Sequence, residues 1–175
     1  MFKKIGLVVV VLVGALLAYA ATKPDSMHVQ RAASIKAPPD KIFPLITDFH
    51  SWSSWSPYEK IDPAMKRAYS GAANGKGAVY DWEGNSYVGQ GRMEITDTSD
   101  PSRVTIKLDF VKRLEGHNVA EFTLAPQGDS TFVKWTMDGP SPYVGKLISV
   151  FVNMDTMIGK DFETGLANLK VIAEK

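Results

Sequence analysis

The chain has 175 residues with 45% hydrophobic and 22% charged content, which suffices for one domain with a substantial core and makes a second domain unexpected. Its formal net charge is +1, from 20 basic and 19 acidic residues, so the clustered Lys and Arg of a nucleic-acid-binding protein are not expected. Because the sequence contains no cysteine, disulfides, thiolate metal sites and a cysteine nucleophile are excluded.

The N-terminus carries the clearest signal in the chain. After MFKK comes the uncharged run IGLVVVVLVGALLAYAA at 5–21, which would extend about 26 Å as a helix. The two lysines before it favour the cytoplasmic side, so the remainder is expected outside. We interpret 1–21 as an inner-membrane anchor for a domain facing the periplasm or cell exterior. Because Ala18-Tyr19-Ala20 also fits a signal-peptidase site, cleavage after Ala20 and a secreted or periplasmic domain is the alternative.

A short polar link at 22–26 leads into one expected domain at 27–175. The domain opens with MHVQRAASIK at 27–36, whose modest alternation predicts a strand. Pro38 and Pro39 introduce a short helix whose apolar residues share one side. A second short helix is predicted between Asp48 and Pro57, inside the aromatic stretch FHSWSSWSPY.

This aromatic stretch is interpreted as a structural closure. Trp52 and Trp55 are three residues apart, so on a helix their indoles share a face. Serines separate them, whereas a stacking platform for nucleic acid interleaves Arg or Lys with its aromatics. We expect this face to close one end of the sheet, with Trp52 and Phe49 nearest the interior. Contact of an indole with a ligand is the alternative.

Between residues 66 and 138 the hydrophobic period is two, which predicts about six antiparallel strands with one apolar face. The runs are separated by segments rich in turn residues, such as SGAANGKG and PQGDS, so a meander of hairpins is expected. The apolar residues that alternate with polar ones are Tyr80, Trp82, Met93, Ile95, Val104, Ile106, Leu108, Phe110, Ala120, Phe122, Leu124, Val133, Trp135 and Met137.

After residue 143 the period changes to 3.6. Apolar residues recur at spacings of three and four from Val144 to Ala173, which predicts one long amphipathic helix. A curved antiparallel sheet and a single long helix bury both apolar faces when the sheet wraps around the helix. The predicted fold class is therefore α+β: a helix-grip arrangement of about seven strands around a long C-terminal helix, with two short helices after the first strand.

The order of elements and several motifs resemble the helix-grip fold of the START and pollen-allergen superfamily, and within it the SRPBCC, polyketide cyclase/dehydrase-like bacterial branch. The matching segments are IKAPPDKIFPLITDFHSWSSWSPY, GAVYDWEGN with GQGRMEI, TFVKWTMDG and MIGKDFETGLANLK, which together span nearly all of 27–172. The resemblance implies a cavity between sheet and helix that holds lipids, polyketides or other apolar molecules. It does not imply one activity, because this fold is a scaffold class.

The side chains of apolar parity supply the residues expected to line that cavity, and carboxylates and lysines such as Asp81, Glu94 and Asp109 take the opposite parity. The expected ligand-binding residues are Phe49, Trp52, Tyr80, Trp82, Met93, Leu108, Phe110, Phe122, Trp135, Met137, Phe151, Met154, Ile158 and Phe162. No catalytic residue is predicted, because no inward acid or base is recognised on these strands.

Metal and cofactor sites are not predicted. His28, His50 and His117 lie far apart without helical pairing or a carboxylate at ligand spacing. GQGRME lacks the third glycine of a dinucleotide fingerprint and lies in a strand pattern, so Gly89 and Gly91 are interpreted as permitting a bulge or bend.

Three functions remain open from the sequence. The favoured one is binding or carriage of a small hydrophobic ligand, such as a lipid, isoprenoid or polyketide-like molecule, by an exported and membrane-tethered domain. The first alternative is a cyclase or dehydratase-like enzyme, and the second is a protein-interaction module with a packed interior. The sequence names neither the ligand nor any protein partner.

Overall fold

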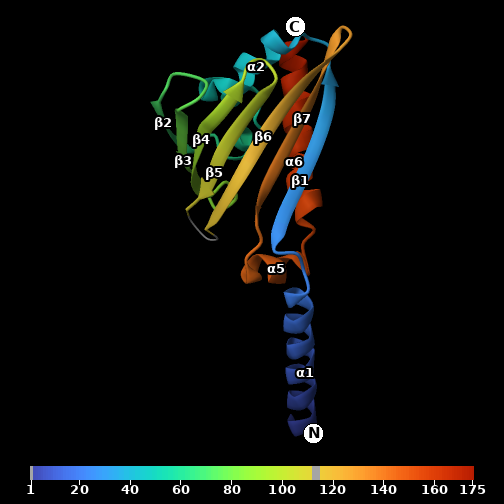
Figure 1. Cartoon of the computed structure of the whole chain (residues 1–175). Coiled ribbons are helices and arrows are strands. Elements are labelled where there is room, and N and C mark those ends of the chain that lie inside the picture. Colours follow the sequence, from blue (N-terminus) through green and yellow to red (C-terminus); the bar gives the residue numbers. More distant parts are fainter. Residues whose placement is uncertain (1, 112–114) are drawn as a thin grey trace.

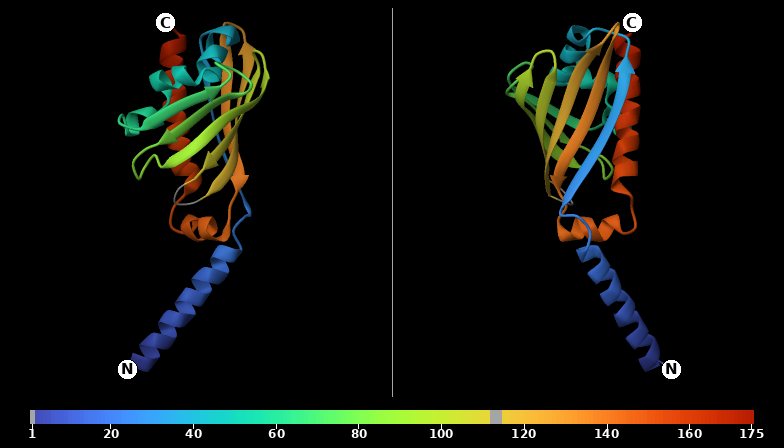
Figure 2. Two further views of the ribbon diagram at one scale, coloured as in Figure 1. Left: turned by 90° about the vertical axis from the view of Figure 1, so that its left-hand side faces the viewer. Right: turned by 45° about the vertical axis from the view of Figure 1, so that its right-hand side comes forward.

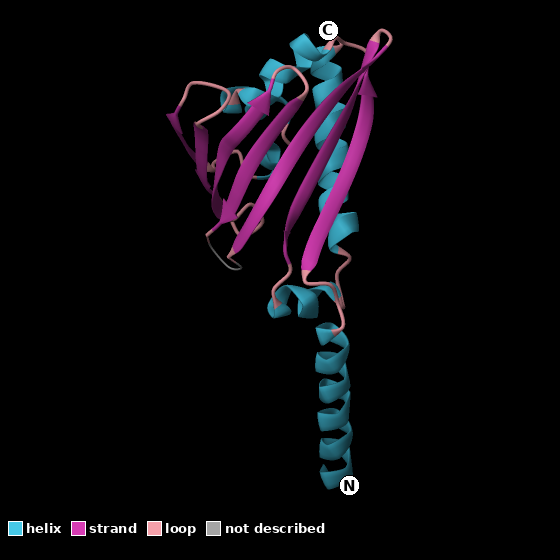
Figure 3. Ribbon diagram, viewed as in Figure 1, coloured by secondary structure: helices cyan, strands magenta, loops and turns pink. Residues whose placement is uncertain are grey.

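The computed structural model describes residues 2–111 and 115–175, and Figure 1 shows a twisted sheet, a long helix against one of its faces and a separate N-terminal helix. Figure 3 shows the same view by secondary structure. The elements are α1 (Phe2–Ala21), β1 (Ser26–Ile35), α2 (Pro39–Thr47), η1 (Phe49–Ser51), α3 (Trp52–Trp55), α4 (Tyr58–Ile61), β2 (Lys66–Gly71), β3 (Ala78–Glu83), β4 (Gln90–Ser99), β5 (Arg103–Phe110), β6 (Gly116–Gln127), β7 (Ser130–Pro140), α5 (Tyr143–Ser149) and α6 (Met154–Ala173).

The sheet has seven strands in the order β1-β7-β6-β5-β4-β3-β2, and all described pairings are antiparallel. Strands β2 to β7 form the predicted meander, while β1 pairs with β7. The expected α+β helix-grip fold is thereby confirmed. One irregularity of the sheet interrupts the β4 and β5 register between Ile95 and Asp97, beyond the Gly89 and Gly91 positions where a bulge or bend was expected.

Apart from Arg31 on β1, the two faces of the sheet separate apolar from charged side chains as the alternation predicted. On the outer face, Asp81 pairs with Arg92 and Asp109 with Lys107. On the inner face, cross-strand rows of apolar side chains face α6 and the short helices. The row through Trp135 contains its register partners Phe122 and Arg31, and Val104 opposite Phe122. The apolar residues of these rows form the core because alternate side chains of a strand point to the same face.

Helix α6 lies along β1 and packs against α2 and α3, as the two views of Figure 2 show. Its buried residues recur through its length at helical spacing, namely Gly159, Phe162, Gly165, Leu166, Leu169 and Ala173. Pro57, which follows α3, lies against Gly165. A Cβ added at Gly165 would lie 3.2 Å from the Pro57 ring and 2.9 Å from the Trp135 ring. Glycine at position 165 therefore lets α6 approach the sheet closely at Trp135.

The expected continuous helix from Val144 is wrong, because the chain is helical in two separate segments, α5 and α6. Asn153 has an extended backbone, and its side chain accepts a hydrogen bond from the Thr156 amide at 3.0 Å, which begins α6. Phe151 lies in the connection between the helices and is 74% exposed. The prediction that Phe151 lines the interior is therefore wrong. A residue in a turn between two helices does not belong to the buried face of either helix.

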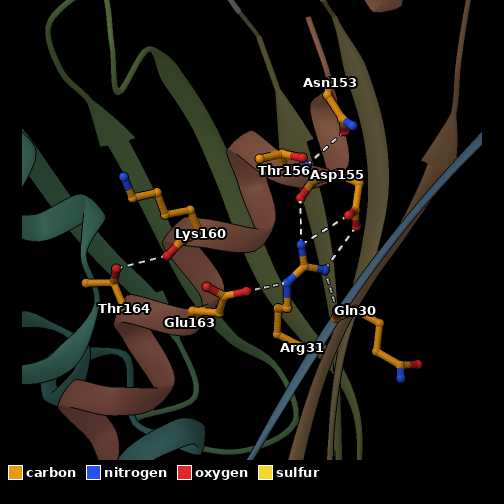
Figure 4. Close-up of polar contacts among 8 residues, drawn as sticks. All are labelled: Gln30, Arg31, Asn153, Asp155, Thr156, Lys160, Glu163 and Thr164. Atoms are coloured by element: carbon orange, nitrogen blue, oxygen red, sulfur yellow. Dashed lines mark hydrogen bonds and ion pairs between the residues drawn. The ribbon is translucent and has the colours of Figure 1, made fainter.

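An inward-facing arginine fastens β1 to α6 (Figure 4). The guanidinium of Arg31 donates to both carboxylate oxygens of Asp155 at 3.0 and 3.1 Å, and its Nε donates to Glu163 at 2.7 Å. These hydrogen bonds raise the pKa of Arg31. The guanidinium occupies the space beside Gly159, where an added Cβ would lie 2.0 Å from Arg31 Nη2. Glycine at this position therefore lets the charged group pass close to the helix.

Candidate functional site

The half of the interior nearer the C-terminal end of α6 is filled by five rings, which we call the aromatic cluster: Trp52, Trp55, Phe122, Trp135 and Phe162. Trp135 is its centre, because its ring stacks on Phe162 at a centroid distance of 3.9 Å and on Phe122 at 4.7 Å. Trp52 and Trp55 meet Trp135 edge-on at 6.4 and 5.8 Å. Offset and edge-on contacts of this kind add to the free energy of burial.

The two indoles of the aromatic stretch are fixed from both ends. Trp52 Nε1 donates to the Ile46 carbonyl and Trp55 Nε1 to the Leu45 carbonyl, each at 2.9 Å. From α6, the Asn168 amide donates to the Trp55 carbonyl at 2.9 Å. Both indoles are buried. The interpretation of this stretch as a structural closure is therefore consistent with its packing and hydrogen bonding.

The other half of the interior, toward the start of α6, is less completely covered. We call it the open half and define it by Leu108, Phe110, Asn118, Met137, Met154 and Ile158. Strand β7 runs toward α5 and α6 runs away from it, as Figure 1 shows. Met137, which follows Trp135 on the inner face of β7, and Ile158, one turn before Phe162 on α6, therefore both lie on the α5 side of the stacked Trp135 and Phe162 rings. Leu108, Phe110, Met154 and Ile158 remain partly exposed although they belong to the inward-facing sets.

Asn118 is a buried polar residue in the open half. It lies on the inner face of β6 opposite Leu108, and a Cβ added at Gly116 would lie 3.6 Å from its Nδ2 and 3.8 Å from the Phe110 ring. A Cβ at Gly139 would collide with its Oδ1, so that glycine makes room for the amide. No described residue supplies the Asn118 side chain with a hydrogen bond. Among the described residues the fully buried side-chain atom without a partner is Trp135 Nε1, so the Asn118 amide still reaches solvent. A solvent-accessible amide at the edge of an apolar surface is a candidate ligand contact.

A buried carboxylate lies on the other side of the interior, on α4. Glu59 accepts a hydrogen bond from the Tyr80 hydroxyl on one oxygen and from Arg67 Nε on the other, both at 2.6 Å. Arg67 also donates to the Met65 carbonyl. Tyr80 is buried on the inner face, as its parity predicted, and its hydroxyl donates to this carboxylate. Both carboxylate oxygens are engaged, so in this arrangement Glu59 joins β2 and β3 to α4.

Three tyrosines with raised pKa values predict how the stability of the fold depends on pH. Burial and the Glu59 carboxylate raise the pKa of Tyr80, burial and Asp161 raise that of Tyr58, and burial raises that of Tyr69. The folded chain therefore holds these protons above the ordinary tyrosine pKa of about 10, where the unfolded chain loses them. This contribution to stability is fully present below about pH 10 and is lost as the pH rises further.

We expect the absorbance of tyrosinate at 295 nm, measured at about pH 11 where unperturbed tyrosines ionise, to be lower for the folded chain than for the chain in urea, although both contain six tyrosines. The midpoint urea concentration should fall over the same pH range. Equal absorbance in both states, with the fold intact by circular dichroism, would contradict the packing of these hydroxyls.

The predicted site residues divide into three groups in the structure. Phe151 alone is largely exposed, as stated above. The partly exposed members are Leu108, Phe110, Met154 and Ile158. The buried members are Phe49, Trp52, Tyr80, Trp82, Met93, Phe122, Trp135, Met137 and Phe162.

Sequence reasoning missed Arg31, Glu59 and Asn118. Arg31 and Asn118 each occupy a strand position whose neighbours two residues away are apolar. A polar residue at such an inward-facing position was the signal that could have identified them. Glu59 had no such signal, because it lies on a four-residue helix. Within residues 2–111 and 115–175, no group of three His, Asp or Glu side chains is placed to hold a metal ion.

Two surface hollows lie outside the interface between sheet and α6. One of about 240 Å³ is bordered by Phe49, Tyr69 and Val79 at the β2 and β3 edge. The other, of about 420 Å³, lies between Lys23 and residues 149–154. The aromatic cluster fills the interior so closely that a ligand at the open half would lie against a partly exposed surface.

Comparisons with known proteins agree with this architecture. The profile of the family described as polyketide cyclase / dehydrase and lipid transport matches residues 26–174. A comparison with curated proteins found no match.

Three solved structures illustrate how far the likeness extends. A protein from Chromobacterium violaceum is 14% identical with a TM-score of 0.61, over 87% of this chain and 99% of that one. Aha1 from Colwellia psychrerythraea, solved as a dimer, is 18% identical with a TM-score of 0.56, over 85% and 96%. Major latex-like protein 151 from Panax ginseng is 14% identical with a TM-score of 0.59, over 87% and 100%. At these identities the likeness establishes the fold alone.

Proposed function

Because the chain belongs to the polyketide cyclase / dehydrase and lipid transport family, we propose that its domain binds a small hydrophobic molecule at the open half of the sheet and α6 interface. The observation that carries the proposal is the set of inward-facing apolar side chains that remain partly exposed around an unpartnered amide. Leu108, Phe110 and Ile158 supply apolar surface, and covering them with a ligand is favourable by about 25 cal/mol for each Å² removed from water.

The ligand's chemistry follows from the composition of this half. Apolar side chains surround Asn118, so the ligand is mainly hydrocarbon with one group able to hydrogen-bond to an amide, such as a hydroxyl or carbonyl. A ligand group that hydrogen-bonds to Asn118 replaces the solvent that binding removes from this amide. A fatty acid, an isoprenoid alcohol or a polyketide-like molecule satisfies both requirements.

The proposal places the domain at a membrane through α1. This helix is long and apolar enough to cross a bilayer, and its 18-residue span from Lys4 to Ala21 is almost entirely uncovered by the rest of the chain. Lys3 and Lys4 at the N-terminal end of α1 favour the cytoplasm, which puts the domain in the periplasm or at the cell exterior. The function proposed is therefore binding or carriage of an apolar molecule by an exported, membrane-tethered domain.

The test begins with the chain purified from cells in detergent, extracted with organic solvent and analysed by mass spectrometry. We expect an apolar compound that is absent from a mock purification. A dansyl-labelled medium-chain fatty acid is then titrated into the stripped chain, and its fluorescence is expected to rise and saturate. Failure both to extract an apolar compound and to load this probe would overturn the proposal.

Matched variants locate the binding. Leu108→Glu puts a carboxylate among the apolar residues and is expected to weaken probe binding about tenfold or more, because burying an unpaired charge is costly. Val119→Glu makes the same kind of change on the outer face, where Val119 is 47% exposed opposite Lys107, and is expected to leave binding unchanged. Asn118→Leu covers the case in which Leu108→Glu fails to fold, and should weaken binding of the fatty acid more than that of a dansyl alkane.

A further inference from the structure

The end of the domain nearest α1 exposes several apolar side chains. Tyr143 and Val144 begin α5, and Phe151 and Val152 follow it; they are 46%, 53%, 74% and 38% exposed. The Phe151 amide donates to the Ile148 carbonyl at 3.0 Å, so the turn after α5 holds Phe151 close to the end of that helix. We call Tyr143, Val144, Phe151 and Val152 the base patch.

A contact with α1 shows where α5 lies along the axis of the N-terminal helix. The Tyr143 hydroxyl donates to the Leu17 carbonyl at 2.9 Å, and Leu17 lies four residues before Ala21, the last residue of α1. At 1.5 Å per residue this contact is about 6 Å inside the end of the apolar helix. When α1 spans a bilayer, the Tyr143 hydroxyl therefore lies at the membrane interface.

Polar contacts with the link after α1 hold α5 close to the end of that helix. The buried Lys146 ammonium on α5 pairs with the Asp25 carboxylate in the link after α1. The Ser141 amide also donates to the Asp25 carbonyl at 2.7 Å. The link is short, so α5 follows α1 closely, and Figure 1 shows α5 lying across the top of α1.

Side chains of the kind found at membrane interfaces gather at the same level. Tyr19 is exposed near the end of α1, and the Lys23 ammonium lies 4.8 Å from the centre of its ring. Tyrosines are enriched where a helix leaves the hydrocarbon, and lysines there attract anionic lipid headgroups. Tyr143 adds a second tyrosine from α5.

We propose that the base patch is a membrane-docking surface that rests on the same phospholipid bilayer as α1. This inference rests on the membrane tether proposed above. It adds that the domain contacts the bilayer surface directly and is not separated from it by a flexible linker. Phe151 and Val144 enter the interfacial region, where burial of their apolar surface stabilises the docked orientation. Met154 of the open half borders the same hollow as Phe151, so docking sets the ligand-binding half close to the bilayer.

The cysteine-free chain allows a direct test by site-directed spin labelling. Full-length Phe151→Cys and Val144→Cys variants are labelled with a nitroxide and reconstituted into vesicles of phosphatidylethanolamine and phosphatidylglycerol. Leu12→Cys reports whether α1 is immersed, and Asp129→Cys reports from the β6 and β7 turn at the opposite end of the sheet. Power saturation measures collisions of each label with oxygen and with a water-soluble nickel chelate.

Labels at 151 and 144 are expected to give an oxygen-to-nickel collision ratio several-fold higher than the label at 129. A nickel-accessible label at 151 and 144, with the label at 12 immersed, overturns the docking surface while the tether survives. Labels at 151 and 144 shielded from both reagents indicate contact between protein copies and also overturn it. A nickel-accessible label at 12 overturns the tether, and the docking inference with it.

Discussion

Replacing Trp135 by alanine is expected to lower the free energy of unfolding by about 3–5 kcal/mol, the range for removing a large aromatic side chain from a core. The ring is 3% exposed and stacks on both Phe162 and Phe122, so its loss leaves a cavity between the sheet and α6. Urea denaturation of the full chain in detergent, followed by far-ultraviolet circular dichroism, measures the change.

Trp135→Phe is the matched control. A phenyl ring retains part of the stacking and removes an indole Nε1 that has no hydrogen-bond partner among the described residues. We therefore expect a clearly smaller loss than for alanine, because one unpartnered buried donor disappears. An alanine variant within about 1 kcal/mol of the original chain, the size of an average substitution, would show that the aromatic cluster does not hold the domain together.

Deleting residues 2–21 is expected to move the chain from the carbonate-resistant membrane fraction to the soluble fraction. The expected shift is nearly complete, because these residues contain the one described helix long and apolar enough to span a bilayer. The intact mass of the membrane-extracted original chain should include residues 1–20, as expected of an uncleaved anchor. Cell fractionation and mass spectrometry measure both quantities.

The alternative, a cleaved signal, is distinguished by Ala20→Leu, which removes a small residue from the proposed peptidase site. For an anchor, this variant should fractionate like the original chain. A soluble original chain that begins at Ala21, together with a membrane-bound Ala20→Leu variant, would contradict the anchor and establish export with cleavage.

Local patterns were sufficient for most of the fold. The alternation from Tyr80 to Met137 predicted which strand residues face the core, because adjacent side chains on a strand must point to opposite faces. The return of a 3.6-residue period after residue 143 predicted a helix against that face, although it did not reveal the break at 150–153. There, Asn153 begins a new helix and Phe151 turns outward, and apolar spacing alone does not distinguish a turn from a continued helix.

The two faces of the sheet, the covering helix and the apolar N-terminal segment could all be predicted from the sequence, because each depends on a periodicity or a length within a continuous stretch of residues. The polar contacts of the interior became visible in the folded chain alone: Arg31 with α6, Glu59 with Tyr80, and Asn118 beside Gly139. Each of these joins positions distant along the chain. The free energy of a buried polar group depends on the partner that the fold brings to it, and a local pattern contains no record of that partner.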